Sequence, residues 1–290
     1  MPGKDKYRYL MLSFFVLAAC VAGCHCETGP LHINPDTEPG WELVLQDDFE
    51  SPELDQSLWD TGYLWGRCWP PAYYTDNGNY EIQGGALRLI ARREPVTGFC
   101  FDWDAEGNFT PYYEDFAYSS GMLYGREPFR YGYFECTFKV PEGKSFNAAF
   151  WLYGEKACEI DVFEILGSDT TDAQMTLHWK ERDWLVGTRQ WPKHVRREAP
   201  SFSEDWHTFG VLWEPDRLDW YLNGERVFQS AWTRYIRGRH IPDVDMHVIL
   251  TLGIGGMDGD PNEETPFPAA FLVDRVRVYR TPATIIPSQS

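Results

Sequence analysis

Three carboxylates stand close together in the run Cys158–Ile165, which reads Cys-Glu-Ile-Asp-Val-Phe-Glu-Ile. Successive side chains of a β-strand point to opposite faces, so Glu159 and Asp161 would share one face and the apolar residues beside them the other. Glu164 is five positions from Glu159, and a regular strand would place it on the wrong face. A one-residue β-bulge around Val162–Phe163 would return Glu164 to the side of the other two acids.

Carboxylates gathered in this way are suited to cleaving a glycosidic bond. Like charges raise one another's pKa, so at least one of the three acids holds a proton near neutral pH. A retaining glycosidase uses two carboxyl groups about 5–5.5 Å apart: one attacks the anomeric carbon, and the other, protonated, donates to the leaving oxygen. The alternative is an edge strand with solvated acids, but repeated like charge is a poor way to stabilise a sheet. The pattern therefore favours catalysis.

The rest of the chain must supply the elements that position these acids. Strand-like runs alternate with turn residues, and Asn223-Gly224 is a hairpin signal. The runs are Trp41–Phe49, Tyr80–Ala91, Gly121–Tyr124, Tyr131–Val140, Ala148–Tyr153, Glu159–Ile165, Met175–Trp179, Thr208–Trp213, Arg217–Leu222, Val248–Leu252 and Leu272–Tyr279. They predict an all-β sandwich of two stacked antiparallel sheets, with helix limited to one or two turns near Ser201–Trp206.

Composition and charge narrow the class of ligand. The 290 residues suffice for one large β-sandwich, and 13 Trp, 16 Tyr and 18 Phe favour strands. The 44 acidic and 26 basic side chains give a net charge of −18. This balance argues against binding to nucleic acid or to an anionic membrane surface. A neutral ligand, or one recognised locally, fits better.

The first residues read as a targeting segment. A basic head precedes the apolar run Leu10–Ala19, which is too short to span a membrane. Two stretches, ending at Cys20 and Cys24, resemble the bacterial lipobox, in which a lipidated Cys becomes the new N-terminus. We expect residues 1–23 to be a lipoprotein-type signal peptide, Cys24 to carry the lipid and residues 24–40 to form a tether.

The alternative to a lipoprotein signal is an ordinary secretory signal with incidental cysteines. Under both interpretations the protein is exported, as a bacterial cell-envelope lipoprotein or as an extracellular protein. Contact with the membrane is then expected only through the N-terminal lipid anchor.

Four cysteines lie in the expected domain, and export makes disulfide bonds between them possible. Cys68 and Cys100 fall in loop-like segments rich in aromatic residues and are the candidate pair. Cys136 and Cys158 fall in strand-like runs and are either buried thiols or a second pair. None shows the close Cys/His spacing of a zinc site.

The carboxylate run also resembles the signature E-[ILV]-D-x-x-E of glycoside hydrolase family 16, in the bulged form of its laminarinase-, agarase- and carrageenase-like members. Further segments are similar to family landmarks in family order: Tyr118-Ser-Ser-Gly121, Phe129-Arg-Tyr-Gly-Tyr-Phe-Glu135, Ala149-Phe-Trp-Leu152, Trp206-His207, Trp220-Tyr-Leu-Asn-Gly224 and Val273-Asp-Arg-Val-Arg-Val-Tyr279. The resemblance assigns residues 41–281 to the catalytic domain and leaves 282–290 as a C-terminal tail.

This resemblance implies a concanavalin-like β-jelly roll whose concave sheet forms an open cleft. It also implies that Glu159 is the nucleophile, Glu164 the acid/base and Asp161 the residue that assists both. Trp151 is similar to the family tryptophan that floors the subsite beside the nucleophile; the alternative is a core tryptophan.

Further substrate-binding candidates surround the carboxylates. His178 is expected on the next strand, where it would hydrogen-bond an acid or serve only the structure. Trp69 and Trp179 fall where aromatic side chains can rim a cleft. Arg182 lies in a basic segment, residues 180–197, that would contact sulfate or uronate groups or would simply be solvated.

The substrate expected is a polysaccharide. The segment Trp69–Asp76 departs from the Asn-x-Glu-x-Gln pattern usual in laminarinase-like members, which favours an algal β-galactan of the agar, porphyran or carrageenan type over a β-1,3(4)-glucan, the close alternative. The expected reaction is retaining endo-hydrolysis; transglycosylation and a non-catalytic carbohydrate-binding jelly roll are the alternatives.

No cofactor and no catalytic metal are expected. A structural calcium ion is considered at acids such as Asp48 and Asp274. The protein is expected to be a monomer.

Overall fold

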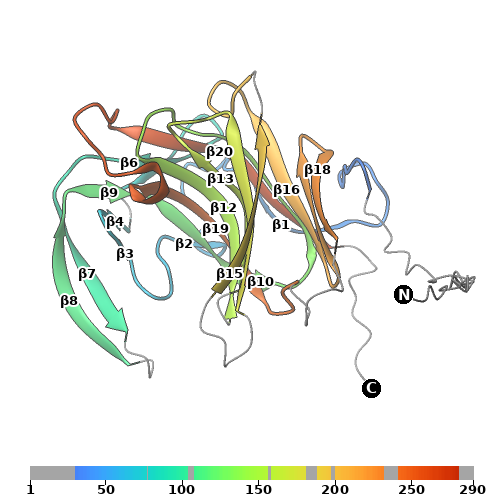
Figure 1. Ribbon diagram of the computed structural model, residues 1–290, viewed down its shortest axis with the longest axis horizontal. Helices are drawn as coiled ribbons and strands as arrows, with labels where there is room; N and C mark the ends of the chain where they lie inside the picture. The colour runs from blue at the N-terminus through green and yellow to red at the C-terminus, as the bar shows by residue number, and fades with distance from the viewer. Residues whose placement is uncertain are drawn as a thin grey trace, which may run out of the picture.

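The computed structural model describes residues 30–76, 78–103, 108–155, 158–180, 188–196, 200–231 and 241–280. They form two large antiparallel β-sheets stacked face to face (Figure 1), and Gly256–Asp258 form a short 3-10 helix, η2. The described part of the chain contains no α-helix and no helix long and apolar enough to cross a membrane. The prediction of an all-β sandwich is confirmed.

The first sheet, called the outer sheet, has the strand order β18-β17-β16-β11-β20-β6-β5, and β1 pairs with β20 beside β6. Its strands are β1 (Glu42–Asp47), β5 (Tyr80–Ile82), β6 (Leu87–Ala91), β11 (Gly132–Lys139), β16 (His207–Glu214), β17 (Arg217–Leu222), β18 (Glu225–Ala231) and β20 (Ala269–Arg280). Asn223 and Gly224 have φ values of 52° and 82°, as the predicted hairpin turn between β17 and β18 requires.

The second sheet, called the cleft sheet, has the strand order β15-β14-β13-β12-β19-β10-β2. Its strands are β2 (Trp59–Asp60), β10 (Met122–Phe129), β12 (Phe146–Gly154), β13 (Cys158–Leu166), β14 (Asp172–Lys180), β15 (Thr188–Arg196) and β19 (Met246–Ile254). The run of acids therefore lies on β13, an interior strand, and not on an edge strand.

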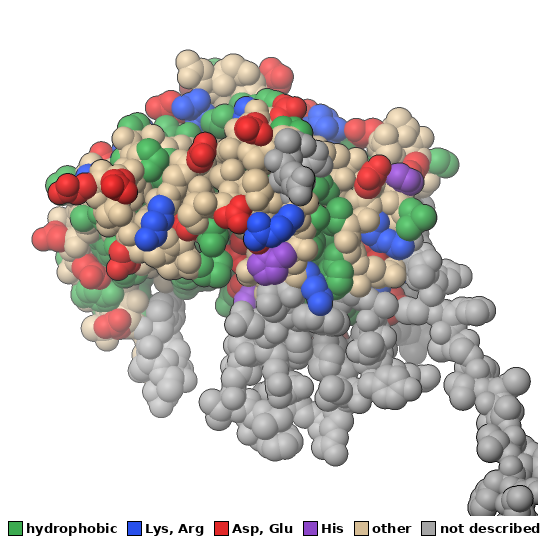
Figure 2. Space-filling view, turned by 45° about the horizontal axis from the view of Figure 1, so that its top comes forward, with side chains coloured by type: hydrophobic (Ala, Val, Ile, Leu, Met, Phe, Trp, Pro, Cys, Tyr) green, Lys and Arg blue, Asp and Glu red, His purple; other side chains and the backbone are tan. Residues whose placement is uncertain are grey.

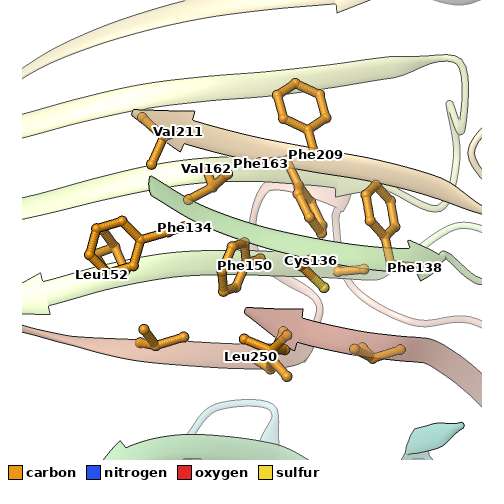
Figure 3. Packing of buried hydrophobic residues seen from close by; sticks show 14 of the residues in the cluster. Phe134, Cys136, Phe138, Phe150, Leu152, Val162, Phe163, Phe209, Val211 and Leu250 are labelled. Carbon is orange, nitrogen blue, oxygen red and sulfur yellow. The ribbon is translucent and has the colours of Figure 1, made fainter. Parts of the chain in front are cut away.

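Alternate side chains of both sheets meet in one hydrophobic layer (Figure 3). Phe138 of the outer sheet stacks on Phe163 of the cleft sheet with ring centroids 4.0 Å apart. Burying one such ring contributes on the order of 2–3 kcal/mol. Because apolar residues occupy this face of the cleft sheet, its polar residues are left for the opposite face.

Two small sheets accompany the sandwich. The first consists of β3 (Cys68–Trp69), β4 (Ala72–Tyr74) and β9 (Tyr118–Ser120), and the second is the hairpin of β7 (Val96–Trp103) and β8 (Phe109–Phe116), which projects from the sandwich (Figure 1). The predicted disulfide Cys68–Cys100 joins β3 to β7. Cys136 and Cys158 are not disulfide-bonded, so the second pair is not formed.

The prediction of one or two helical turns near Ser201–Trp206 is wrong, because this segment forms a turn without a helix. The Ser201 N–H donates to Oε2 of Glu204 at 2.8 Å, and the Glu204 N–H donates to the Ser201 carbonyl at 3.1 Å. These two bonds satisfy the polar groups of the segment in a turn, so a helix is not needed.

Residues 30–41, called the N-terminal strap, pack against the surface of the outer sheet that faces away from the core. The Ile33 N–H donates to the Gly224 carbonyl at 2.9 Å, and Asp36 pairs with Arg277 at 2.9 Å. Ile33 also joins a buried cluster formed by Tyr133, Leu212, Tyr221 and Tyr279, with Trp41 packed against it. This part of the expected tether is therefore held on the domain.

Candidate active site

The predicted β-bulge is present in β13. The pairing register shifts between Asp161 and Glu164 against both neighbouring strands, β12 and β14. Val162 and Phe163 are both fully buried in the hydrophobic layer (Figure 3), as expected where one extra residue is inserted into a strand. Glu164 consequently returns to the face that carries Glu159 and Asp161, and all three line one pocket.

Side chains from the two flanking strands hold Glu164. The Asn147 amide of β12 donates to Oε1 of Glu164 at 3.1 Å, and the Gln174 amide of β14 donates to Oε2 at 3.3 Å. Gln174 also donates to the Thr176 hydroxyl at 3.1 Å. Because both oxygens have a donor, the carboxyl group is fixed in one orientation.

His178 of β14 lies beside the other two acids. Its Nε2 is 3.0 Å from Oδ2 of Asp161 and 3.4 Å from Oε1 of Glu159. Asp161 is also hydrogen-bonded to Glu159 and to the Thr176 hydroxyl. Asp161 is 3% exposed, so these contacts replace the water that a buried carboxyl lacks.

Burial raises the pKa of each of the three carboxyl groups, because a charged carboxylate is poorly solvated there. The effect is large for the fully buried Asp161, whose pKa lies well above its usual value. The pKa of Glu159 is raised to about 8, by burial first and by the charge of Asp161 second, while His178 opposes the rise. The pKa of Glu164 is raised by burial, although its hydrogen bond from Asn147 lowers it. The group therefore retains protons near neutral pH and titrates as a unit.

The pocket over these carboxylates lies on the free face of the cleft sheet. Its lining residues are Tyr63, Trp69, Tyr74, Asn147, Ala149, Trp151, Glu159, Asp161, Glu164, Thr251 and Gly253. Trp151 is half-buried and meets Tyr63 edge to face, with ring centroids 5.9 Å apart, while Trp69 is 52% exposed at the rim. The pocket therefore presents carboxyl groups and aromatic rings together.

Tyr63, which lines the pocket together with the acids, was not predicted. Tyr63 stacks on Trp65 with centroids 4.6 Å apart and is hydrogen-bonded to Tyr74. Trp65 in turn lies 4.8 Å from Tyr153. Tyr63 lies far from the acids in sequence, and only the folded chain brings it to them. The amide donors to Glu164 were also missed, because Asn147 and Gln174 each lie one residue before a predicted strand-like run.

The structure gathers several of the predicted site residues. Trp69 and Trp151 line the pocket with the three acids, and His178 contacts two of those acids. The side chain of Trp179, and Arg182 and Cys24, lie outside the described residues.

Metal binding was considered at two places. Within the described part of the chain, the one group of three or more side chains that could hold a cation is Glu159, Asp161 and His178, whose ligand atoms lie within 4.8 Å of one another. Asp48, considered for calcium, pairs with Arg277 at 3.2 Å. Calcium at Asp48 and Asp274 stays a prediction.

Comparison with known proteins gives consistent matches. Residues 73–267 match the family model described as glycosyl hydrolases family 16. The chain is 29% identical over 270 residues to a beta-glucanase of Rhodothermus marinus, covering 84% of this chain and 87% of that protein. It is 29% identical over 283 residues to glucan endo-1,3-beta-glucosidase A1 of Niallia circulans, covering 86% of this chain and 40% of that protein. The solved endo-beta-1,3-glucanase from Pyrococcus furiosus superposes with a TM-score of 0.69 at 28% identity, covering 87% of this chain and 99% of that one.

Proposed function

The chain belongs to the glycosyl hydrolases of family 16, and on that premise we propose that it is a retaining endo-β-1,3(4)-glucanase with Glu159 and Glu164 as catalytic residues. The observation that carries the proposal is the bulge in β13, which places both acids on one face of the strand. The pocket that they share is lined by Trp151 and Trp69, and aromatic rings are suited to the C–H faces of a sugar.

Glu159 is assigned the nucleophilic step, in which its carboxylate forms a bond to the anomeric carbon while the bond to the leaving oxygen breaks. A nucleophile must be ionised when it attacks. Asp161 is the most deeply buried of the three acids and shares a hydrogen bond with Glu159. When Asp161 holds the shared proton, its O–H donates to Glu159 and stabilises the Glu159 carboxylate.

Glu164 is assigned the proton transfers. Burial raises the pKa of its carboxyl group, which favours the protonated form needed to donate to the leaving oxygen. Asn147 and Gln174 keep its two oxygens oriented. After the leaving group departs, the Glu164 carboxylate takes a proton from water, which attacks the anomeric carbon and releases Glu159.

His178 is assigned a positioning role. Its ring lies within 3.4 Å of both Glu159 and Asp161, and its positive charge, when protonated, lowers the pKa of Glu159. His178 therefore supports the ionised nucleophile without contacting the leaving oxygen.

A glucan is proposed over the galactan favoured by the sequence. The relatives named above are described as glucanases. The galactan interpretation relied partly on the basic segment 180–197. Arg196 of that segment forms ion pairs with Asp169 at 3.1 Å and Asp172 at 3.3 Å, which occupy its guanidinium group.

Two other functions would use the same site. A transglycosylase would pass the sugar from Glu159 to another sugar in place of water. A non-catalytic binding module would gain nothing from three crowded carboxyl groups, whose burial destabilises the folded chain.

The decisive experiment combines activity and stereochemistry. Wild-type protein is incubated with laminarin, lichenan, agarose, porphyran and carrageenan, and product sizes separate hydrolysis from sugar transfer. Proton NMR of the first products should show the β-anomer. Cleavage of a galactan alone, or release of the α-anomer, would overturn the corresponding part of the proposal.

Variants test the two roles separately. Glu159→Ala should lose at least about 10³-fold in kcat while still binding the polysaccharide, and added azide should give an α-glycosyl azide by direct attack. On an aryl β-glucoside, whose phenolate leaves without being protonated, Glu164→Ala should give a β-glycosyl azide, because azide then attacks the glycosyl-enzyme intermediate. Glu142→Ala, which removes an exposed carboxylate, serves as the control. Full activity of Glu159→Ala would refute the nucleophile assignment.

We also propose that the chain is exported, anchored through a lipid on Cys24 and monomeric. Metabolic labelling with a radioactive fatty acid should mark the wild type and spare Cys24→Ser. Labelling that persists in Cys24→Ser but is lost in Cys20→Ser would move the anchor to Cys20. Size-exclusion chromatography of the protein without residues 1–23 tests the monomer.

A further inference from the structure

The β7–β8 hairpin has two unlike faces. In its register Phe99 pairs with Tyr113, and Cys100 pairs with Tyr112, so residues of alternate pairs point to opposite sides. One face is packed: Cys100 is fully buried and disulfide-bonded to Cys68 of the neighbouring small sheet. The hairpin is therefore fixed to the domain on this side.

The other face carries a row of aromatic rings, called the aromatic ladder and formed by Phe99, Phe101, Phe109 and Tyr113. Ring centroids are 5.1 Å apart for Phe99 and Tyr113, 4.9 Å for Phe99 and Phe101, and 5.2 Å for Phe101 and Phe109. Three of these side chains are exposed: Phe99 by 40%, Phe109 by 56% and Tyr113 by 73%. Neighbouring exposed rings mark a binding surface more often than scattered ones do.

The ladder lies against the chain segment that leads to the rim of the active-site pocket. A Cβ atom added to Gly66 would lie 3.4 Å from the ring of Phe101, so this ring lies against the loop that leads to Trp69. Trp69 lines the pocket, and the adjacent Cys68 is bonded to the hairpin. One segment of the chain thus contributes to the pocket and contacts the ladder.

Charge indicates the chemistry of the ligand. Residues 96–116 contain five acidic side chains, Asp102, Asp104, Glu106, Glu114 and Asp115, and no Lys or Arg. On the face of the molecule seen in Figure 2, acidic side chains are widely spread with basic side chains among them. An anionic polymer or membrane would be repelled, whereas a neutral polysaccharide offers uncharged C–H faces to aromatic rings.

We propose that the aromatic ladder is an accessory binding surface for a neutral β-glucan chain, which extends beyond the pocket across the β7–β8 hairpin. The identity of the ligand rests on the proposed function, whereas the binding surface does not depend on turnover. The ladder would hold long chains close to the pocket and would be out of reach of short oligosaccharides.

The test compares a polymer with a short substrate. The variant Phe99→Ser/Tyr113→Ser is made in the full chain, because both side chains are exposed and their loss leaves the core intact. Its matched control is Trp206→Ser, which removes an exposed aromatic side chain from the turn before β16. Binding to insoluble β-1,3-glucan is measured in the Glu159→Gln background, so that no hydrolysis occurs.

The ladder variant should bind the insoluble glucan at least about fivefold more weakly than its parent, because two of the rings that stack on the sugar are removed. Its kcat/KM on a soluble β-glucan trisaccharide should stay within about twofold of wild type. The control variant should match its parent in both measurements.

Unchanged binding to the polymer would overturn the inference. A loss of kcat/KM on the trisaccharide as large as the loss of binding to the polymer would also overturn it, because the hairpin would then act by supporting the pocket. Failure of the parent to bind β-glucan would also overturn it. Self-association that the ladder variant abolishes would identify a second copy of the chain as the occupant instead. Absence of hydrolysis by the wild type, with binding that depends on the ladder, would refute only the proposed function.

Discussion

Replacing Glu159 by Gln is expected to stabilise the folded protein at alkaline pH. A carboxyl group whose pKa is raised on folding binds its proton more tightly in the folded chain than in the unfolded chain. Its effect on stability is absent below its ordinary pKa of 4.5 and grows as the pH rises to about 8. Above that pH the effect is constant. The glutamine side chain of the variant has no proton to lose, so the variant should escape this loss of stability.

The size of the gain follows from the two pKa values. The difference between 4.5 and about 8 corresponds to an upper limit of roughly 5 kcal/mol. Asp161 and His178 contact Glu159 and can redistribute protons and charge, so we expect about 2–3 kcal/mol. Asp161 and Glu164 remain in both proteins, but they titrate together with Glu159, which is a further reason why the expected gain is smaller than the upper limit.

The assay is urea unfolding followed by tryptophan fluorescence at pH 4, 6, 8 and 9. The free energy of unfolding of Glu159→Gln minus that of the wild type should be smallest at pH 4, rise between pH 4 and 8, and level off above pH 8. Glu142→Gln, at an exposed position, controls for the loss of a carboxylate in general. A difference that is the same at pH 4 and pH 9 would refute the reasoning from burial.

Three further predictions concern the same framework. Asn147→Leu removes a donor that lowers the pKa of Glu164, so the alkaline limb of the kcat/KM profile should move to higher pH; a move to lower pH would contradict this cause. Phe163→Ala should lower the free energy of unfolding by about 3–5 kcal/mol in urea titrations, since this ring is buried at the bulge; a loss under about 1 kcal/mol would mean that the bulge is not anchored by the core. Cys68 and Cys100 are separated by 32 residues, and replacing both by Ser should lower the free energy of unfolding by up to about 4 kcal/mol in the same assay. An unchanged free energy of unfolding would show that the disulfide bond does not constrain the unfolded chain.

The bulge could be predicted because parity is a strict property of a strand. Glu159 and Glu164 are separated by an odd number of positions, and only an inserted residue places both on one face. The apolar pair Val162 and Phe163 supplies that insertion, since both side chains are buried. The β-bulge could therefore be predicted from the spacing of these residues, without knowledge of the fold.

The aromatic part of the site could not be predicted in the same way. The contact between Tyr63 and Trp151 joins segments far apart in the chain. The local pattern of apolar and polar residues does not indicate which distant segments come together. The segment around Cys100 was predicted to be loop-like, whereas it forms β7; Gly98 and Pro111 interrupt the alternation that would have indicated the two strands of the hairpin. The N-terminal strap was interpreted as tether because its apolar residues are few, although Ile33 alone joins a buried cluster.

The N-terminal strap determines how the molecule is presented to its surroundings. Residues 30–41 lie on the outer sheet, whereas the carboxyl groups lie in the pocket on the cleft sheet. The polypeptide therefore enters the domain on the side opposite the pocket. Immobilising the protein on a bead or a vesicle through residues before position 30 should consequently leave its groove accessible from the bulk solution. A bulky polymer would then dock without steric interference from the support.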